Sequence, residues 1–221
     1  MCIRDRFRPL SWVSGDLYDV FRLDETHIGF YVADVVGHGL PAALLTMFIK
    51  KALQTKRIEG HSYHIIPPNE VLEQLNADMC QQNFTSCQFC TAFYAIVDTD
   101  SLRLRYARAG HPSPVLLDRH GQPRRLQADG RLLGAFPGET FPAEQVQLSP
   151  GNRLVTFSDG IEGILSASPG EPREQALVEE MLRLSHLLPE EMVQQLTGRI
   201  DDRRVEVRAD DITLLVMEVA G

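Results

Sequence analysis

The sequence predicts an α+β fold with antiparallel sheets. Segments in which apolar residues alternate with polar ones come in adjacent pairs joined by short polar turns, as in β-hairpins. Segments of helical periodicity come in two pairs, whereas a parallel sheet would place a helix between successive strands. The 221 residues, of which 43% are hydrophobic and 24% charged, are ordinary for one globular domain.

The first half of the chain begins with a predicted hairpin of strands at 16–23 and 27–33. A helix is expected from about 41 to 56, because Pro41 suits a first helical turn. Its apolar face would be formed by Leu44, Leu45, Phe48, Ile49 and Leu53. A second helix comes after the segment PPNE, and its apolar face would be formed by Val71, Leu72, Leu75 and Met79.

The second half of the chain begins with another hairpin and is rich in strands. The strands are expected at 91–98, 102–110, 114–118, 124–128, 144–148 and 153–158. Two helices are expected between 173 and 200, separated near Leu188 and Pro189, and the apolar segment ITLLVMEV forms a last strand.

Composition restricts the class of function. A formal charge of -8 argues against a nucleic-acid or anionic-membrane surface, and no apolar run approaches the ~20 residues of a membrane span. Four cysteines without a signal peptide indicate the cytoplasm. Cys87 and Cys90 have the spacing of half a zinc site, but the other half is missing, so free thiols are expected. Residues 1–9 are charged and without periodicity, and we expect a non-domain or altered remnant before a domain at 10–221.

Aspartates stand at the ends of several apolar strands. Asp34 ends the segment IGFYVA, Asp159 ends RLVTFS, and Asp210 and Asp211 precede ITLLVMEV. Asp16 begins the hairpin whose other arm leads to Asp34. In an antiparallel sheet the end of one strand lies beside the start of its neighbour, so these carboxylates can gather at one edge.

Gathered carboxylates require a cation, because like charges at close range repel one another. Oxygen ligands alone select Mg²⁺ or Mn²⁺ rather than zinc. Two such ions bridged by a carboxylate could acidify a shared water, giving a hydroxide placed for attack on phosphorus. Taken singly, each aspartate is also compatible with a structural role in a turn or a helix cap.

The segment after Asp34 has a second interpretation. Gly37, Gly39 and Ala42 match the spacing of a dinucleotide-binding loop, which would indicate an oxidoreductase. Such a loop requires a parallel second strand after the first helix, and the chain instead continues into another helix.

Several motifs in this order resemble the SpoIIE/RsbU-type protein serine/threonine phosphatases, a bacterial branch of the metal-dependent PPM (type 2C) phosphatases. The motifs are SGDLYDVF, ADVVGHGLPAALL, YARAGHPSPVLL, LLGAFPGETF, LVTFSDGIEG and DDITLLVMEV, and the resemblance covers essentially residues 10–219. It implies an α-β-β-α sandwich, in which two antiparallel sheets are flanked by helix pairs, with a centre of two Mn²⁺ or Mg²⁺ ions.

The resemblance also implies roles for individual residues. Asp34 would bridge both ions and Val35 would offer its backbone carbonyl. Asp159 and Asp210 would complete the shell of the second ion. Asp16 would bind an ion or hydrogen-bond to a coordinated water.

Three residues are less defined by the resemblance. Asp211 is a weaker ligand candidate, because the first member of such an acidic pair is the ligand in related enzymes. His38 would protonate the leaving oxygen or shape the helix entry. His111 marks a tight turn near the site, for which turn structure is favoured over chemistry.

The resemblance implies hydrolysis of phosphoserine or phosphothreonine on a bacterial signalling protein in a partner-switching pathway. The expected substrate is a STAS-domain anti-sigma-factor antagonist, and an upstream sensor or receiver domain is expected in the full-length protein. Homodimerisation is left open. The alternative is a catalytically silent PPM-like domain that regulates by binding.

Overall fold

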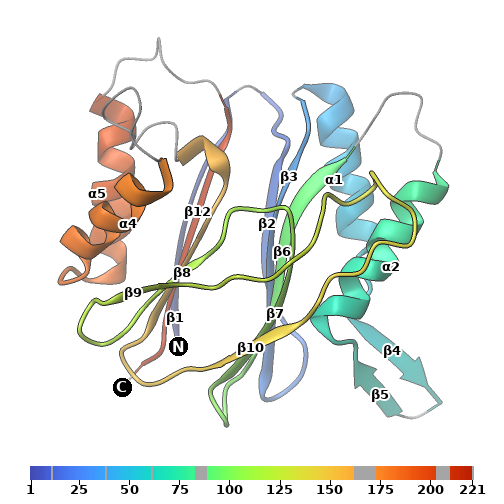
Figure 1. Ribbon diagram of the computed structural model, residues 1–221, viewed down its shortest axis with the longest axis horizontal. Helices are drawn as coiled ribbons and strands as arrows, with labels where there is room; N and C mark the ends of the chain where they lie inside the picture. The colour runs from blue at the N-terminus through green and yellow to red at the C-terminus, as the bar shows by residue number, and fades with distance from the viewer. Residues whose placement is uncertain are drawn as a thin grey trace. The chain divides into compact units, whose positions relative to one another are not determined.

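The computed structural model describes residues 1–10, 12–37, 39–60, 62–82, 89–161, 173–202 and 210–220 (Figure 1). The chain forms two compact units. The central unit comprises Val13–His111 and Gln127–Gln147. The terminal unit comprises Met1–Trp12, Pro112–Leu126 and Leu148–Gly221. Each unit is built around a five-stranded antiparallel sheet, as the apolar alternation of the sequence predicts.

The sheet of the central unit has the strand order β10-β7-β6-β3-β2. Its strands are β2 (Asp16–Arg22), β3 (His27–Val35), β6 (Cys90–Asp98), β7 (Arg103–Ala109) and β10 (Glu144–Gln147). The predicted hairpins β2–β3 and β6–β7 are confirmed.

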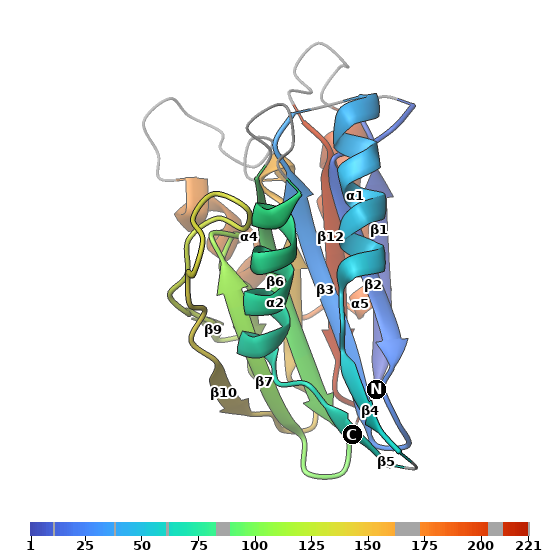
Figure 2. The ribbon, with the colours of Figure 1, turned by 90° about the vertical axis from the view of Figure 1, so that its right-hand side faces the viewer.

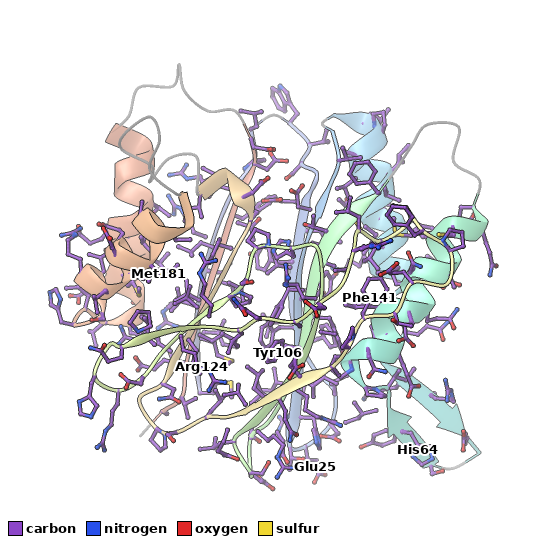
Figure 3. All side chains as sticks on the ribbon, in the orientation of Figure 1. Glu25, His64, Tyr106, Arg124, Phe141 and Met181 are labelled. Carbon is purple, nitrogen blue, oxygen red and sulfur yellow. The ribbon has the colours of Figure 1, made fainter. Side chains whose placement is uncertain are left out.

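Helices α1 (Leu40–Ala52) and α2 (Pro68–Gln81) cover one face of this sheet (Figure 2). They bury a cluster that includes Leu45 and Ile49 of α1, Leu72 of α2 and Tyr94 of β6. Phe141, labelled in Figure 3, belongs to the same cluster. Burial of these side chains drives the helices onto the sheet, because each large apolar side chain contributes about 1.5–3 kcal/mol.

The structure corrects two predictions about α1. The helix ends at Ala52 rather than near residue 56, because Leu53 adopts an extended conformation and the chain continues into β4 (Lys56–Glu59). Leu44, predicted on the apolar face, is 59% exposed. Ala42 occupies the buried stripe with Leu45 and Ile49 instead.

Strands β4 and β5 (Ser62–Ile65) form a separate two-stranded sheet that the sequence did not indicate. All the described residues of this pair except Ile65 are exposed. With no buried face, the strands carry no apolar alternation from which they could be recognised.

The sheet of the terminal unit has the order β1-β12-β11-β8-β9. Its strands are β1 (Cys2–Arg8), β8 (Val115–Leu117), β9 (Pro123–Arg125), β11 (Arg153–Phe157) and β12 (Ile212–Glu218). Helices α4 (Arg173–Leu184) and α5 (Pro189–Asp202) are those expected between 173 and 200 (Figure 1). Met181 of α4 and Leu196 of α5 are fully buried against Val216 of β12 and its neighbours.

Residues 1–9 differ from expectation. The sequence predicts that they lie outside the domain, but Cys2–Arg8 pair with β12 along its whole length, from Cys2 opposite Glu218 to Arg8 opposite Ile212. The Arg and Asp side chains of this segment give it no apolar alternation, so the strand is recognised only from its pairing with β12.

Among the described helices, none is both long and apolar enough to cross a membrane.

Candidate metal centre

Two carboxylates lie opposite one another where β2 begins and β3 ends. Asp16 is the cross-strand partner of Asp34 in the β2–β3 hairpin. Asp16 is 5% exposed and Asp34 is half-buried. The Cβ atoms of such partners lie about 4.5–5.5 Å apart on the same face, and like charges in this position destabilise the sheet. A cation bound by both carboxylates would remove this repulsion.

The hairpin register that brings these aspartates together is set by the turn between the strands. One carboxylate oxygen of Asp24 accepts hydrogen bonds from the backbone N–H groups of Thr26, at 2.9 Å, and His27, at 2.7 Å. The carboxylate of Asp24 also pairs with the His27 ring at 2.9 Å. The turn thus fixes the pairing that continues along both strands to Asp16 and Asp34.

Glycines control the backbone beside Asp34. Gly37 and Gly39 have φ values of 92° and 78°, in the left-handed region that glycine tolerates, and α1 begins directly after them. The two glycines thus turn the chain from β3 into α1. His38, the candidate proton donor, lies outside the described residues.

Gly15 permits the closest backbone approach at this edge. Its carbonyl accepts a hydrogen bond from the N–H of Val35 at 3.1 Å. A Cβ atom on Gly15 would lie 2.8 Å from the carbonyl oxygen of Val35 and 3.1 Å from that of Gly37. Two carbonyl oxygens therefore converge where a side chain would otherwise be, next to the paired carboxylates.

Thr91 extends the row of polar side chains across the sheet. It is the cross-strand partner of Asp34 on β6, and its hydroxyl lies 2.7 Å from Nδ1 of His111. His111 is fully buried, and its carbonyl accepts a hydrogen bond from Arg108 at 2.7 Å. The sequence drew attention to His111 only as a turn residue and missed Thr91. Thr91 could have been found from the strand pairing, because residue 91 lies opposite residue 34 when β6 pairs with β3.

The negative charge of Asp34 affects the pKa of the neighbouring Cys90 thiol. Burial raises the pKa of the Cys90 thiol, and the negative charge of Asp34 raises the pKa further. Among the described cysteines, Cys2, Cys80 and Cys90 form no disulfide. Cys87 lies outside the described residues.

The terminal unit places the other predicted aspartates around the start of β12. The N–H of Ser158 donates to the carbonyl of Thr213 at 3.0 Å, and the N–H of Thr213 donates to the Ser158 hydroxyl at 2.9 Å. A Cβ on Gly160 would overlap the carbonyl oxygen of Asp211, so the segment after β11 packs directly against the start of β12. The predicted adjacency of these strand ends is confirmed within this unit.

The carboxylates of Asp159, Asp210 and Asp211 differ in their exposure to solvent and in their hydrogen bonds. Asp159 and Asp210 are exposed. Asp211 is 5% exposed, and its carboxylate accepts a hydrogen bond from the N–H of Leu10 at 2.6 Å. No group of three or more His, Cys, Asp or Glu side chains that could hold a metal occurs among the residues that the structure describes.

The family model described as Stage II sporulation protein E (SpoIIE) matches residues 24–220. The chain belongs to the SpoIIE family. It is 32% identical to the phosphoserine phosphatase RsbU of Bacillus subtilis (strain 168) over 216 residues, which are 95% of this chain and 60% of RsbU. The chain spans between 37% and 60% of the lengths of three curated relatives that it matches.

Solved structures support the SpoIIE-family fold. The SiaA-PP2C domain of Pseudomonas aeruginosa superposes with a TM-score of 0.81 at 22% identity, over 98% of this chain and 85% of that domain. RsbX, solved in complex with magnesium, gives a TM-score of 0.68 at 15% identity, over 97% of this chain and 92% of RsbX. The predicted PPM-like fold class is therefore confirmed.

Proposed function

We propose that this SpoIIE-family chain is a metal-dependent protein phosphatase that hydrolyses phosphoserine or phosphothreonine. The observation that carries the proposal is the pairing of Asp16 with Asp34 at the strand ends of the central unit. The name of RsbU as a phosphoserine phosphatase supports the reaction type. The proposal treats residues 10–221 as one phosphatase domain, which the family match over 24–220 supports.

The donor atoms of this edge suit a hard divalent cation. The carboxylates of Asp16 and Asp34 and the carbonyl of Val35 offer oxygen alone, and oxygen ligands select Mg²⁺ or Mn²⁺. The magnesium complex of RsbX, a protein of similar fold, supports this choice. When bound, two such ions would make water nucleophilic at neutral pH and stabilise charge on the phosphoryl group.

Each residue has a proposed task in the centre. Asp34 would bridge the ions, and Asp16 would bind an ion or orient water. Asp159 and Asp210, which are exposed, would provide further carboxylates, whereas Asp211 would serve mainly by holding Leu10.

Other residues would support the ligands or the leaving group. Thr91, held by His111, lies beside Asp34 and would limit the rotation of its carboxylate. His38 would protonate the leaving oxygen or shape the entry to α1.

The proposed substrate is a phosphorylated signalling protein, with a STAS-domain anti-sigma-factor antagonist as the specific candidate. An upstream sensor or receiver domain would control the activity in a partner-switching pathway in the cytoplasm. The name of RsbU as a phosphoserine phosphatase supports a phosphorylated substrate, and the rest of the assignment rests on the motif resemblance.

The decisive experiment is hydrolysis of p-nitrophenyl phosphate and of a phosphoseryl peptide with and without Mn²⁺. Asp34→Asn and Asp16→Asn are expected to lower kcat/KM by more than about 100-fold, the upper range for loss of outer-shell partners of a metal. Asp100→Asn, in an exposed turn, is the matched control. Metal binding is followed separately by calorimetry, so a chain that binds Mn²⁺ without hydrolysis would indicate a silent regulatory domain. Hydrolysis indifferent to metal and to both substitutions would refute the proposal.

A further inference from the structure

A pocket of about 260 Å³ opens on the central unit, far from Asp16 and Asp34. It is lined by His27, Ile96, Asp98, Arg103, Arg105 and Gln145. His27 begins β3 whereas Asp34 lies near its end, so the two are separated by about 23 Å along the strand. The turn at this end carries Glu25, which is labelled in Figure 3.

The register of the sheet explains how the pocket is built. His27, Asp98 and Arg103 form one cross-strand row on β3, β6 and β7. Ile96, Arg105 and Gln145 form the next row, on β6, β7 and β10. Ile96 is buried in the cluster beneath α1 and α2, so the pocket opens on the helix side of the sheet, with an apolar floor and polar walls.

The pocket carries two arginines, of which Arg103 is exposed and Arg105 partly buried. Neither Arg103 nor Arg105 has an ion-pair or hydrogen-bond partner among the described residues. Asp98 opposes Arg103, yet its carboxylate accepts hydrogen bonds from the Ser101 hydroxyl at 2.6 Å and from the N–H of Asp100 at 3.0 Å. The Ser101 hydroxyl is the largest reason that the pKa of Asp98 lies below its ordinary value. Asp98 is thus engaged by its own turn, and it forms no ion pair with either guanidinium group among the described residues.

A buried hydroxyl next to the pocket also lacks an acceptor. Tyr94 is fully buried on the same face as Ile96, and its hydroxyl has no hydrogen-bond partner among the described residues. Burial raises the pKa of Tyr94, and the positive charge of Arg105 opposes that rise. Arg105 therefore lies near enough for its charge to act on the phenol, rather than extending wholly into solvent.

We propose that this pocket binds a small phosphate-bearing anion, held by the guanidinium groups of Arg103 and Arg105 and by the side-chain amide of Gln145. Two guanidinium forks match the several acceptor oxygens of a phosphate, which a single carboxylate does not offer. The volume of about 260 Å³ lies just below the range of about 300–1,000 Å³ for drug-sized ligands, which limits the occupant to free phosphate or a small phosphomonoester.

The test is titration of inorganic phosphate into the metal-free chain carrying Asp34→Asn, which removes phosphate binding through a metal centre. Amide chemical shifts and calorimetry follow the binding. Shifts are expected in β7 and β10, and Arg103→Gln/Arg105→Gln is expected to weaken binding by about tenfold or more. Arg57→Gln/Arg124→Gln removes the same charge from exposed strand positions and should leave binding unchanged.

Two further arms decide the chemistry of the ligand. Glycerol phosphate should bind in the same place, whereas acetate should not. Equal affinity in the two double variants, shifts confined to residues 15–16 and 34–37, or acetate binding as strong as that of phosphate would each overturn the inference. Circular dichroism of both double variants checks that they fold. Because no metal or hydrolysis enters the measurement, its outcome is independent of the proposed phosphatase activity.

Discussion

Gly15 is the residue at which a single added methyl group tests the geometry of the candidate metal centre. A Cβ there would lie 2.8 Å from the backbone carbonyl oxygen of Val35, closer than such atoms normally approach. Backbone cannot rotate away as a side chain can, so Gly15→Ala must displace Val35 and the adjoining Asp34. We expect Mn²⁺ affinity, measured by calorimetry, to fall by about tenfold or more, the scale seen when supporting groups of a metal site are lost.

The control for Gly15→Ala is Gly198→Ala in α5. Apart from its chain neighbours and the backbone of its own helix, no described heavy atom would lie within 4 Å of the Cβ added at Gly198. Alanine in a helix interior stabilises by about 0.5–1 kcal/mol relative to glycine, so this variant should melt slightly higher and bind Mn²⁺ normally. Unchanged Mn²⁺ affinity in Gly15→Ala would show that the Val35 carbonyl does not matter to the site.

Asp24 makes the stability of the β2–β3 turn depend on pH. Partial desolvation alone would raise its pKa, but hydrogen bonds from Thr26 and His27 outweigh this and lower the pKa from 3.8 to about 2. Because this pKa is lower in the folded state than in the unfolded state, the ionised Asp24 carboxylate stabilises the fold fully above about pH 4. This stabilisation disappears as the pH falls toward about 2.

Asp24→Asn should therefore be less stable than the parent near neutral pH, because a neutral amide oxygen accepts these hydrogen bonds more weakly. The difference in urea midpoint should be constant above about pH 5 and narrow as the pH falls from about 4 to about 2, where the carboxylate protonates first in the unfolded and then in the folded state. Glu25→Gln, in the same turn, should show no such narrowing. A difference in urea midpoint between the parent and Asp24→Asn that stays constant with pH would mean that the charge of Asp24 does not stabilise the turn.

At the level of elements, Asn76 joins α2 to the segment that follows Leu133. Its side-chain amide donates to the carbonyl of Phe136 at 2.9 Å, and its carbonyl oxygen accepts from the N–H of Gly134 at 2.8 Å. Asn76 is 1% exposed. Asn76→Ala should lower the free energy of unfolding by about 1–3 kcal/mol, because two partly buried backbone groups lose their partner.

Urea unfolding measures this effect, and Gln74→Ala is the control. Gln74 lies on the exposed face of the same helix and hydrogen-bonds only to Asp78 among the described side chains. Gln74→Ala should change the free energy of unfolding by less than about 0.5 kcal/mol. Equal effects of the two substitutions would show that the contacts of Asn76 add nothing to the packing of α2.

The elements that the sequence predicted well are those with a buried face. In β6, Phe93, Ala95 and Val97 alternate with Tyr94 and Ile96 to serve both faces, and the pattern is readable locally. Strand β1 was not readable, because its Arg and Asp side chains carry no apolar period and its partner β12 lies at the other end of the chain. The same reason explains why Thr91 was missed although Asp34 was found. Asp34 stands at a strand end in the sequence, whereas the relevance of Thr91 depends on pairing between distant strands.

At the scale of the whole molecule, each unit holds its own aspartates on its own sheet. The central unit carries Asp16 and Asp34, and the terminal unit carries Asp159 and Asp210. The proposed ligand set includes aspartates of both units, so it predicts that Mn²⁺ stabilises each unit against unfolding. A ligand that binds only the native state stabilises every part that must be folded to bind it, by about 2.7 kcal/mol when its concentration is 100 times Kd.

Hydrogen exchange can therefore test the ligand set in the intact chain. Mn²⁺ at such a concentration should slow exchange of opening-limited amides by about 100-fold in β3 of the central unit and in β12 of the terminal unit. The double substitution Asp159→Asn/Asp210→Asn should abolish the protection of β12 while leaving part of that in β3, because Asp16 and Asp34 remain. Protection restricted to β3 in the parent would assign the ion to the central unit alone and remove Asp159 and Asp210 from the proposed centre. Protection of both strands that survives the double substitution would likewise remove Asp159 and Asp210, the two exposed carboxylates of the terminal unit, from the proposed centre.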